Sequence, residues 1–442
     1  MRTFRGEEKL KVQAEHGFPK GITKITDGVY FALGYGGSTC TLIEGDEGCV
    51  LVDTLNGVEV AKEAKAEFQK ITDKPIRHII YTHYHHFDHT SGAGVFADAD
   101  TEIIGHQCPY PQYGYSGLLK NAYALRGGKQ FGMGLTPEEH ICIGVGPRNK
   151  ANGAKQSLPP NRLFEEKELE LTLEGIRFLL VEAPGETDDQ IFIYLPDKGV
   201  LFSGDNYYES WPNLYAIRGG QYRDVSAWVS ALAKMRDLNA EYLLPGHTRA
   251  VIGQDTVRET LTNFHDAIEY VLVETLNGMN AGKTMDQLAT SVKLPEKWAE
   301  LPYLQEYYGT VEWTVRSIYT GYLGWFDGNP TRLGTMEPSL KAEKTLAMMG
   351  GAEKVLAEID RALEQEEDQW AVELCDILLD AGCETEVAGT RKAEGLMNLG
   401  RMMTSANGRH YYISCAKELL GTSKLEPMNG AAADVEKKQE KR

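Results

Sequence analysis

The sequence predicts a layered α/β domain followed by an all-α domain, and two observations carry this prediction. From about residue 20 to 250, short β-rich runs alternate with turns and amphipathic stretches, a texture typical of sheets covered by helices. From 251 to about 425 the β-rich runs stop and apolar residues recur at helical spacing. A chain of 442 residues is long enough for two or three domains. We therefore expect a domain boundary near residue 251.

The charge balance excludes one class of function. The chain carries 64 acidic and 46 basic side chains, which gives a formal net charge of -18 with histidine neutral. Lys and Arg are scattered and do not gather into a basic stripe. Because a field of this sign repels phosphate backbones, we expect no nucleic-acid partner.

The apolar runs and cysteines bear on the expected location. The first 20 residues are polar and charged, without the apolar core of a secretory signal. The sequence contains no run of 18 consecutive apolar residues, which is about the length needed to span a membrane. The 7 cysteines are widely spread without a CxxC pair, which is typical of reduced, buried thiols. We expect a cytoplasmic protein with no membrane partner.

The α/β domain is expected to open with strands, followed by a helix and a further strand. The runs 28–33 and 40–43 read as strands, and 48–54 is apolar and ends in a carboxylate. An amphipathic stretch at 57–69 predicts a helix, and 78–81 predicts a buried strand. The later predicted strands are 101–104, 170–173, 177–181, 190–194, 199–202 and 241–244.

The pattern breaks down between residues 106 and 162. This stretch is rich in Gly, Pro, Tyr and Asn and has no sustained period. A long irregular segment in a compact domain is typically a functional loop or a disordered insert. The aromatic run at 110–115 favours a packed, substrate-facing loop.

Helical spacing dominates the second domain. The predicted helices are 255–277, 310–323, 354–363, 368–379, 386–403 and 410–420. Short turns join the last four, so they could stack as two antiparallel pairs. The charged end of the chain, 426–442, is expected to be disordered.

The strongest chemical signal directly follows the predicted strand 78–81. Four of the 11 histidines and one carboxylate lie within seven residues, namely His83, His85, His86, Asp88 and His89. Imidazole and carboxylate are good ligands for zinc-like divalent ions, and a loop at a strand end can direct several of them to one point. A surface histidine cluster without a metal is the alternative.

Three later strand ends carry one ligand-type side chain each. Glu186, Asp205 and His247 each follow an apolar strand and a glycine that permits a sharp turn. Each residue alone would be an ordinary loop residue. Together, and in this order after the histidines, they predict a site assembled from several strand ends.

This combination resembles the metallo-β-lactamase superfamily from about residue 23 to 251. The histidine-rich run is similar to the family's HxHxDH motif, and the three later residues look like its downstream ligand, bridging aspartate and final histidine. The resemblance implies an αββα sandwich that holds two divalent metal ions, expected to be zinc, at its edge. It implies one metal held by His83, His85 and Glu186, a second held by Asp88, His89 and His247, and Asp205 as the bridge.

One departure from the motif concerns its spacing. Two residues, not one, separate His85 from Asp88. Counting forward from the strand selects His83 and His85, whereas counting backward from Asp88 selects His86 and puts Tyr84 in the first place. We favour the first count with a one-residue bulge, because tyrosine is a poor substitute for imidazole at a zinc-type site. The second count, with His86 as the ligand, remains open.

Other segments are similar to the alkylsulfatase branch of that superfamily. Glu186 stands where most of the superfamily has histidine, and a carboxylate there is similar to the alkylsulfatases. The segment 213–219 looks like their sulfate-binding segment, with Arg218 as its arginine, and 308–330 is similar to their helical dimerisation domain. A guanidinium offers a planar, permanently charged fork to two oxyanion oxygens. A structural salt bridge is the alternative role for Arg218.

The resemblance implies hydrolysis of a sulfate ester, an alkyl sulfate or related organosulfate, by a metal-bridged hydroxide. Arg218, with Asn213 or Tyr215, would hold the sulfate, and Asp88 would serve the reaction as a ligand. A homodimer formed by the helices after residue 251 is also implied. Hydrolysis of a lactone, thioester or phosphodiester is the main alternative and would not need Arg218. A non-enzymatic scaffold ranks last.

Overall fold

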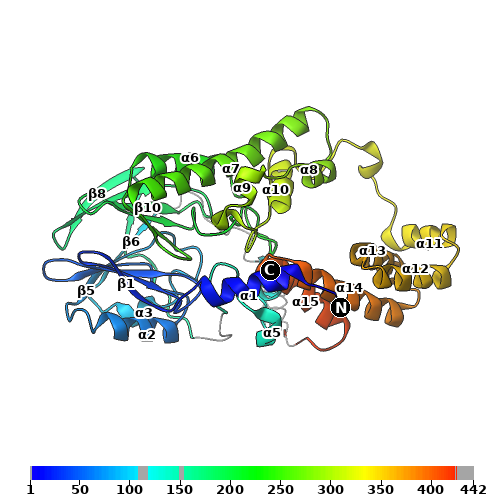
Figure 1. The fold of residues 1–442 in the computed structure, drawn as a ribbon, viewed down its shortest axis with the longest axis horizontal. Coiled ribbons are helices and arrows are strands. Elements are labelled where there is room, and N and C mark those ends of the chain that lie inside the picture. Colours follow the sequence, from blue (N-terminus) through cyan, green and yellow to red (C-terminus); the bar gives the residue numbers. More distant parts are fainter. Residues whose placement is uncertain (1, 108–117, 149–153, 424, 426–442) are drawn as a thin grey trace, which may run out of the picture.

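The fold is built around two β-sheets that pack face to face, with helices on both outer faces (Figure 1). The structure, a computed structural model, describes residues 2–107, 118–148, 154–423 and 425. The aromatic run at 110–115 and the tail at 426–442 lie outside these residues. The predicted fold class, an αββα sandwich followed by helices, is confirmed.

The first sheet contains seven strands in chain order. They are β1 (Gly21–Thr26), β2 (Val29–Leu33), β3 (Cys40–Glu44), β4 (Cys49–Val52), β5 (Ile76–Ile80), β6 (Glu102–His106) and β7 (Arg162–Phe164). Strands β1 to β4 pair antiparallel, and β4 to β7 pair parallel. Helices α2 (Val58–Phe68) and α3 (Ala93–Phe96) make the first two parallel crossovers. The carboxyl ends of β4 and β5 therefore meet at one edge of the sheet.

The second sheet contains six strands in the order β13-β12-β11-β10-β9-β8. They are β8 (Glu168–Leu173), β9 (Ile176–Glu182), β10 (Ile191–Leu195), β11 (Val200–Gly204), β12 (Tyr242–Pro245) and β13 (Val251–Ile252). Only β11 and β12 pair parallel within this sheet, and α6 (Val225–Asp237) connects them. Their carboxyl ends, like those of β4 and β5, end on a shared edge.

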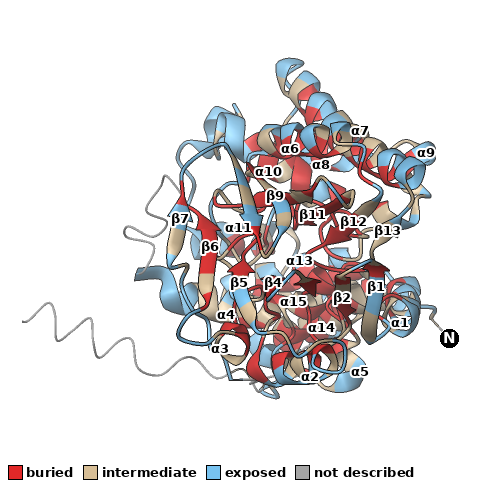
Figure 2. Cartoon of the chain, turned by 90° about the vertical axis from the view of Figure 1, so that its left-hand side faces the viewer, coloured by how far each residue is buried: buried red, intermediate tan, exposed pale blue. Residues whose placement is uncertain are grey.

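Apolar side chains pack between the sheets and under the helices, and most residues of the central strands are buried (Figure 2). Phe31 and Val52 of the first sheet join Phe178 and Phe202 of the second in one buried cluster. Alanines and Phe68 of α2 cover the outer face of the first sheet. Helices α6 and α7 (Gln254–Asn280) cover the second sheet through a separate cluster. The two sheets are thus buried on both faces, as the apolar strand sequences require.

The helices after β13 do not form one independent body. Helix α7 shares its core with α8 (Met285–Ser291), α10 (Val311–Leu323) and the second sheet, and the short α9 (Glu296–Ala299) lies between α8 and α10 in the chain. A second cluster joins α11 (Pro338–Met348), α12 (Ala352–Glu364) and α13 (Asp368–Asp380). The remaining helices, α14 (Thr385–Met402) and α15 (Ala406–Leu419), pack against α1 (Arg5–His16), α4 (Lys120–Gln130) and α5 (Pro137–His140). The chain therefore returns to the sandwich after its helical excursion (Figure 1).

Helices α4 and α5 lie in the segment that was expected to be irregular. Helix α4 contains Gly127 and Gly128, each of which costs about 1 kcal/mol of helix propensity. Its contacts with α15 compensate for this weak local preference. Among the described helices, none combines the length and apolar character needed to cross a bilayer.

Replacing Trp228 with alanine is expected to destabilise the sandwich strongly. Trp228 is fully buried in α6, and its Nε1 donates a 2.9 Å hydrogen bond to the carbonyl oxygen of Asn206. Trp228→Ala should lower the free energy of unfolding by about 3–5 kcal/mol, measured by urea unfolding followed by circular dichroism. Trp370→Ala, at a residue 42% exposed, is the matched control. An equal effect of the two substitutions would contradict the packing described here.

Candidate metal centre

The ligand-type residues gather at the edge of the sandwich where several strands end. Residues 83–89 follow β5, and Glu186, Asp205 and His247 follow β9, β11 and β12. The glycines before two of them permit close contact. A Cβ on Gly204, where φ is 52°, would lie 3.1 Å from Thr82 Cβ. A Cβ on Gly246 would lie 2.4 Å from Asp205 Oδ1, so only glycine fits there.

Four of the expected ligands converge closely. One ligand atom from each of Asp88, His89, Asp205 and His247 lies within 4.8 Å of the others. His89 Nε2 is 3.3 Å from Asp205 Oδ1, and His247 Nε2 is 3.3 Å from Asp205 Oδ2. Asp88 Oδ2 lies 3.5 Å from His247 Nε2, and its side chain is 40% exposed. The cluster is therefore buried on three sides and open to solvent at Asp88.

A second group of expected ligands lies next to the first. His83 Nε2 is 3.9 Å from Asp205 Oδ2, and the centroid of the His83 ring is 4.3 Å from that of His89 and 5.5 Å from that of His86. His86 Nδ1 is 3.5 Å from Glu186 Oε1. His83 therefore connects the first group to His86 and Glu186.

His85, the histidine favoured from the spacing, points elsewhere. Its Nδ1 lies 2.6 Å from Oδ1 of the buried Asp189, whose Oδ2 accepts a 2.8 Å hydrogen bond from Tyr84 N–H. In this geometry His83 and His86 lie near Asp205 and Glu186, whereas His85 and the Tyr84 backbone contact Asp189.

The buried polar atoms fit bound metal ions. His83 Nε2, His89 Nε2, Glu186 Oε2 and Asp205 Oδ1 are buried without a hydrogen-bond partner among the described residues. Orphaned polar atoms of this kind are costly to bury, and divalent cations would satisfy all of them. Imidazole nitrogens and carboxylate oxygens form the donor set that zinc-type ions accept.

The electrostatics of the cluster point the same way. Burial lowers the pKa of His247, but Asp205 and Asp88 outweigh it and raise that pKa to about 10. Burial raises the pKa of Asp205, but His247 and His89 hold it well below its usual value. Such opposite shifts of imidazole and carboxylate pKa values are typical of a site in which a metal ion would displace protons from the imidazoles.

Residues behind the ligands fix their orientation. Asp53 Oδ2 lies 2.9 Å from His89 Nδ1 and accepts a 2.8 Å hydrogen bond from Thr82 Oγ1. The carbonyl oxygen of Gly37 lies 2.6 Å from His247 Nδ1. Both contacts leave the Nε2 atoms facing the cluster, as in carboxylate–histidine–metal arrangements. No role was expected for Asp53, although its position at the end of the apolar run 48–54 could have indicated a place at the site.

Two arginines lie next to the second group. Arg223 Nη2 is 2.7 Å from Glu186 Oε1, and both side chains are buried. Burial raises the pKa of Glu186 to about 7, although Arg223 opposes this shift. Arg218 Nη2 lies 3.4 Å from His86 Nε2. Among the described residues, no carboxylate lies within ion-pair distance of Arg218. The alternative role of Arg218, a structural salt bridge, therefore has no acidic partner among them.

The other expected sulfate contacts differ in their surroundings. Asn213 is buried, its backbone N–H donates to Tyr208 Oη at 2.8 Å, and its Oδ1 has no hydrogen-bond partner in the part of the chain that the structure describes. Tyr215 is 39% exposed, and the described contacts do not join it to the cluster. Tyr308, which was expected in the dimerisation segment, is buried near Arg218. Burial, Glu186 and Asp88 raise the pKa of Tyr308 above its usual range.

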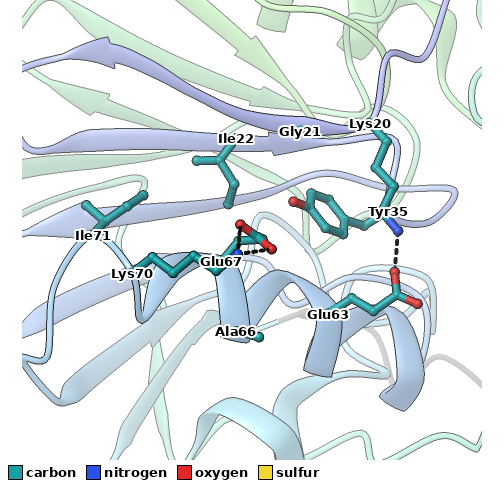
Figure 3. A pocket seen from close by; sticks show the side chains of 9 residues that line it. All are labelled: Lys20, Gly21, Ile22, Tyr35, Glu63, Ala66, Glu67, Lys70 and Ile71. Atoms are coloured by element: carbon teal, nitrogen blue, oxygen red, sulfur yellow. Dashed lines mark hydrogen bonds and ion pairs between the residues drawn. The ribbon is translucent and has the colours of Figure 1, made fainter.

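A surface pocket lies apart from this cluster, between β1 and α2 (Figure 3). Its cations are paired with carboxylates of α2, Lys20 with Glu63 and Lys70 with Glu67. Lys20 Nζ also lies 5.0 Å from the centroid of the Tyr35 ring. This pocket shows the internal charge pairing of an ordinary surface.

Comparisons with known proteins agree with the fold. The family profile of the metallo-β-lactamase superfamily matches residues 33–247, and this is the class of protein that the sandwich and its edge cluster define. The profile of the alkyl sulfatase dimerisation domain matches residues 284–422. A linear primary-alkylsulfatase of Pseudomonas sp. is 37% identical over 396 residues, 87% of this chain and 74% of the relative. The chain belongs to the alkylsulfatase family.

Two further relatives support this placement. The alkyl/aryl-sulfatase BDS1 of Saccharomyces cerevisiae is 31% identical over 422 residues, 92% of this chain and 65% of the relative. The solved structure of the stereoselective inverting sec-alkylsulfatase Pisa1 from Pseudomonas sp. matches with a TM-score of 0.86 at 27% identity. That match covers 96% of this chain and 69% of the other.

Substitution of the neighbouring histidines distinguishes the two motif counts. His86→Ala removes a side chain next to Glu186. We therefore expect the metal content of this variant to be about one ion per chain, against two for the unaltered protein. His85→Ala removes only the contact with Asp189 and should retain both ions at saturating metal. The measurement is metal content by mass spectrometry after removal of free ions. The reverse order would favour the forward count.

Proposed function

We propose that this protein hydrolyses sulfate esters to an alcohol and inorganic sulfate. The observation that carries the proposal is the Arg218 guanidinium, unpaired by any described carboxylate and 3.4 Å from His86 in the edge cluster. The names of the relatives, linear primary-alkylsulfatase and alkyl/aryl-sulfatase, give the substrate class. An alkyl sulfate or a related organosulfate is the expected substrate.

We propose that the cluster holds two divalent ions and that these ions are zinc. One would be held by His83, His86 and Glu186, the other by Asp88, His89 and His247, with Asp205 between them. Such ions supply Lewis acidity and bring the pKa of water toward neutrality. Asp53 keeps His89 Nε2 directed into the cluster, and the exposed Asp88 marks the side where water enters.

The chain's own polar groups bind the sulfate in this proposal. Arg218 offers its planar fork to two sulfate oxygens, and the buried Asn213 provides a second polar contact. The buried Tyr308 carries a phenol O–H group that can donate a hydrogen bond to an anion. Tyr215 is left at the exposed rim of the segment. These donors stabilise charge on the sulfate as the ester bond breaks.

Sulfate release from a panel of esters tests this function. The panel runs from short to long alkyl, aryl and steroid sulfates, with a lactone and a phosphodiester as controls. We expect inorganic sulfate release that stops on chelation and falls about 10²–10³-fold in Arg218→Ala, measured by ion chromatography. Arg177→Ala, at an exposed arginine paired with Asp197, should not change the rate.

The opposite outcome is also informative. Turnover of the lactone or phosphodiester by metal-loaded protein, without sulfate release, would leave the fold and metal site intact and reject the sulfatase function.

We also propose a homodimer, with residues 20–250 as the catalytic domain and 251–425 as the dimerisation domain. The segment from the end of α10 to α11 lies within the residues that the dimerisation profile matches, and it exposes several large apolar side chains. They are Tyr322, Leu323, Trp325, Leu333, Met336, Leu340 and Met348. A second copy of the chain would cover such a surface.

Light scattering at micromolar concentration tests the dimer. The expected mass is twice the 49.1 kDa of one chain. Trp325→Asp, at a side chain 71% exposed, should shift the mass toward the single chain because it places a charge in the interface. Val12→Asp, at an exposed apolar residue of α1, is the control. A 49.1 kDa species of the unaltered protein would contradict the proposal.

A further inference from the structure

Helix α4 lies between the C-terminal helix α15 and the segment that carries Arg218. On the α15 side, Lys129 Nζ is 2.6 Å from Glu418 Oε2. The carbonyl oxygen of Gln130 is 3.1 Å from Nδ1 of the fully buried His410. The end of α4 is thus attached to α15 through a side chain and through its own backbone.

The opposite side of α4 contacts the backbone of the arginine segment. Oε1 of the fully buried Gln130 accepts a 2.9 Å hydrogen bond from Arg218 N–H. Arg126 Nη2 donates a 2.7 Å hydrogen bond to the carbonyl oxygen of Ile217. Both groups belong to the same peptide unit, so α4 fixes the plane from which the Arg218 side chain departs.

Gly127 of α4 lies beside the Arg218 side chain. A Cβ on Gly127 would lie 3.9 Å from Arg218 Cδ, which is an ordinary van der Waals distance. Gly127 and Gly128 weaken the helix, so its shape depends on α15. Gln130 Nε2 has no hydrogen-bond partner among the described residues. Among the described residues, the side-chain amide of Gln130 therefore makes one hydrogen bond, the one that it accepts from Arg218 N–H.

We propose that Gln130 is a positioning residue for Arg218 and that α15 supports sulfate binding through α4. The inference rests on the proposed function, in which Arg218 binds the sulfate. The Arg218 guanidinium reaches within 3.4 Å of His86, and small displacements of such a preorganised group weaken its interaction with the substrate. The C-terminal helices then contribute to the active site as well as to assembly.

Two substitutions of Gln130 separate positioning from packing. Gln130→Leu keeps a similar volume but removes the acceptor for Arg218 N–H. Gln130→Glu keeps an acceptor oxygen at the same place and replaces the unpaired Nε2 with a second oxygen, and burial of the site favours the neutral acid form of the new carboxyl group. We expect Gln130→Leu to raise the KM for an alkyl sulfate and the inhibition constant of inorganic sulfate about tenfold, with an unchanged metal content. Gln130→Glu should restore most of both, and Gln369→Leu, at an exposed site, should change neither.

A double substitution tests whether Gln130 acts through Arg218. In the Arg218→Ala background, Gln130→Leu should cause no further rise in the inhibition constant of sulfate, because its effect passes through that side chain. If Gln130→Leu lowers solubility, Arg126→Ala, at an exposed side chain, serves instead and should give a smaller rise in the same constant. Additive effects, or no effect of Gln130→Leu and Arg126→Ala, would overturn the inference.

The outcomes also distinguish this inference from the proposed function. If Arg218→Ala leaves sulfate release and sulfate inhibition unchanged, the proposed role of Arg218 fails, and this inference fails with it. If Arg218→Ala weakens both but the Gln130 and Arg126 variants do not, the sulfatase function stands and only the positioning role of α4 is rejected.

Discussion

The candidate site depends on one buried carboxylate, Asp205, which faces three imidazoles. His89 and His247 each lie 3.3 Å from one of its oxygens, and His83 lies at 3.9 Å. Such a concentration of polar groups away from water is stable only if charge and hydrogen bonding are balanced. The strand ends, the glycines before the ligands and the orienting contacts of Asp53 all serve this arrangement. The sandwich is therefore the scaffold that holds these loops around the Asp205 carboxylate.

Much of the fold and part of the site follow from local sequence. Apolar β-rich runs located the central strands, and a glycine before each later ligand marked where a strand ends. The edge strands β1, β7 and β13 and the helix α1 were not expected. Strands β7 and β13 contain only 3 and 2 residues, and β1 and α1 are polar, without a clear apolar pattern. Pairing with neighbouring strands, which no local pattern encodes, decides their structure.

The remaining part of the site depends on contacts distant in sequence. The direction of His85 depends on Asp189, which lies in another loop and contacts it. Helix α4 has two glycines, so its structure depends on α15. Tyr308 looked like part of a dimerisation helix, but it is buried near Arg218 and packs with Ile143, Val145 and Tyr208. In each case the deciding partner is a residue that the local pattern does not name.

The acidic surface and an anionic substrate are compatible. At physiological salt the Debye length is about 8 Å, so most of the net charge of -18 is screened at the mouth of the site. Inside, Arg218 and Arg223 lie close to the cluster. Binding of an anion is then governed by these near charges, while the remote acidic residues reduce the rate of encounter.

The first helix joins the two ends of the described chain. Glu7 in α1 lies 2.7 Å from Arg401 in α14 and 3.3 Å from Arg409 in α15, and α15 in turn holds α4. The sandwich and the C-terminal helices are therefore coupled thermodynamically, and their local opening reactions cannot be independent. Hydrogen exchange in α14, α15 and α4 would then report one shared opening free energy. Destabilising α1 would therefore increase local opening as far away as the segment that carries Arg218.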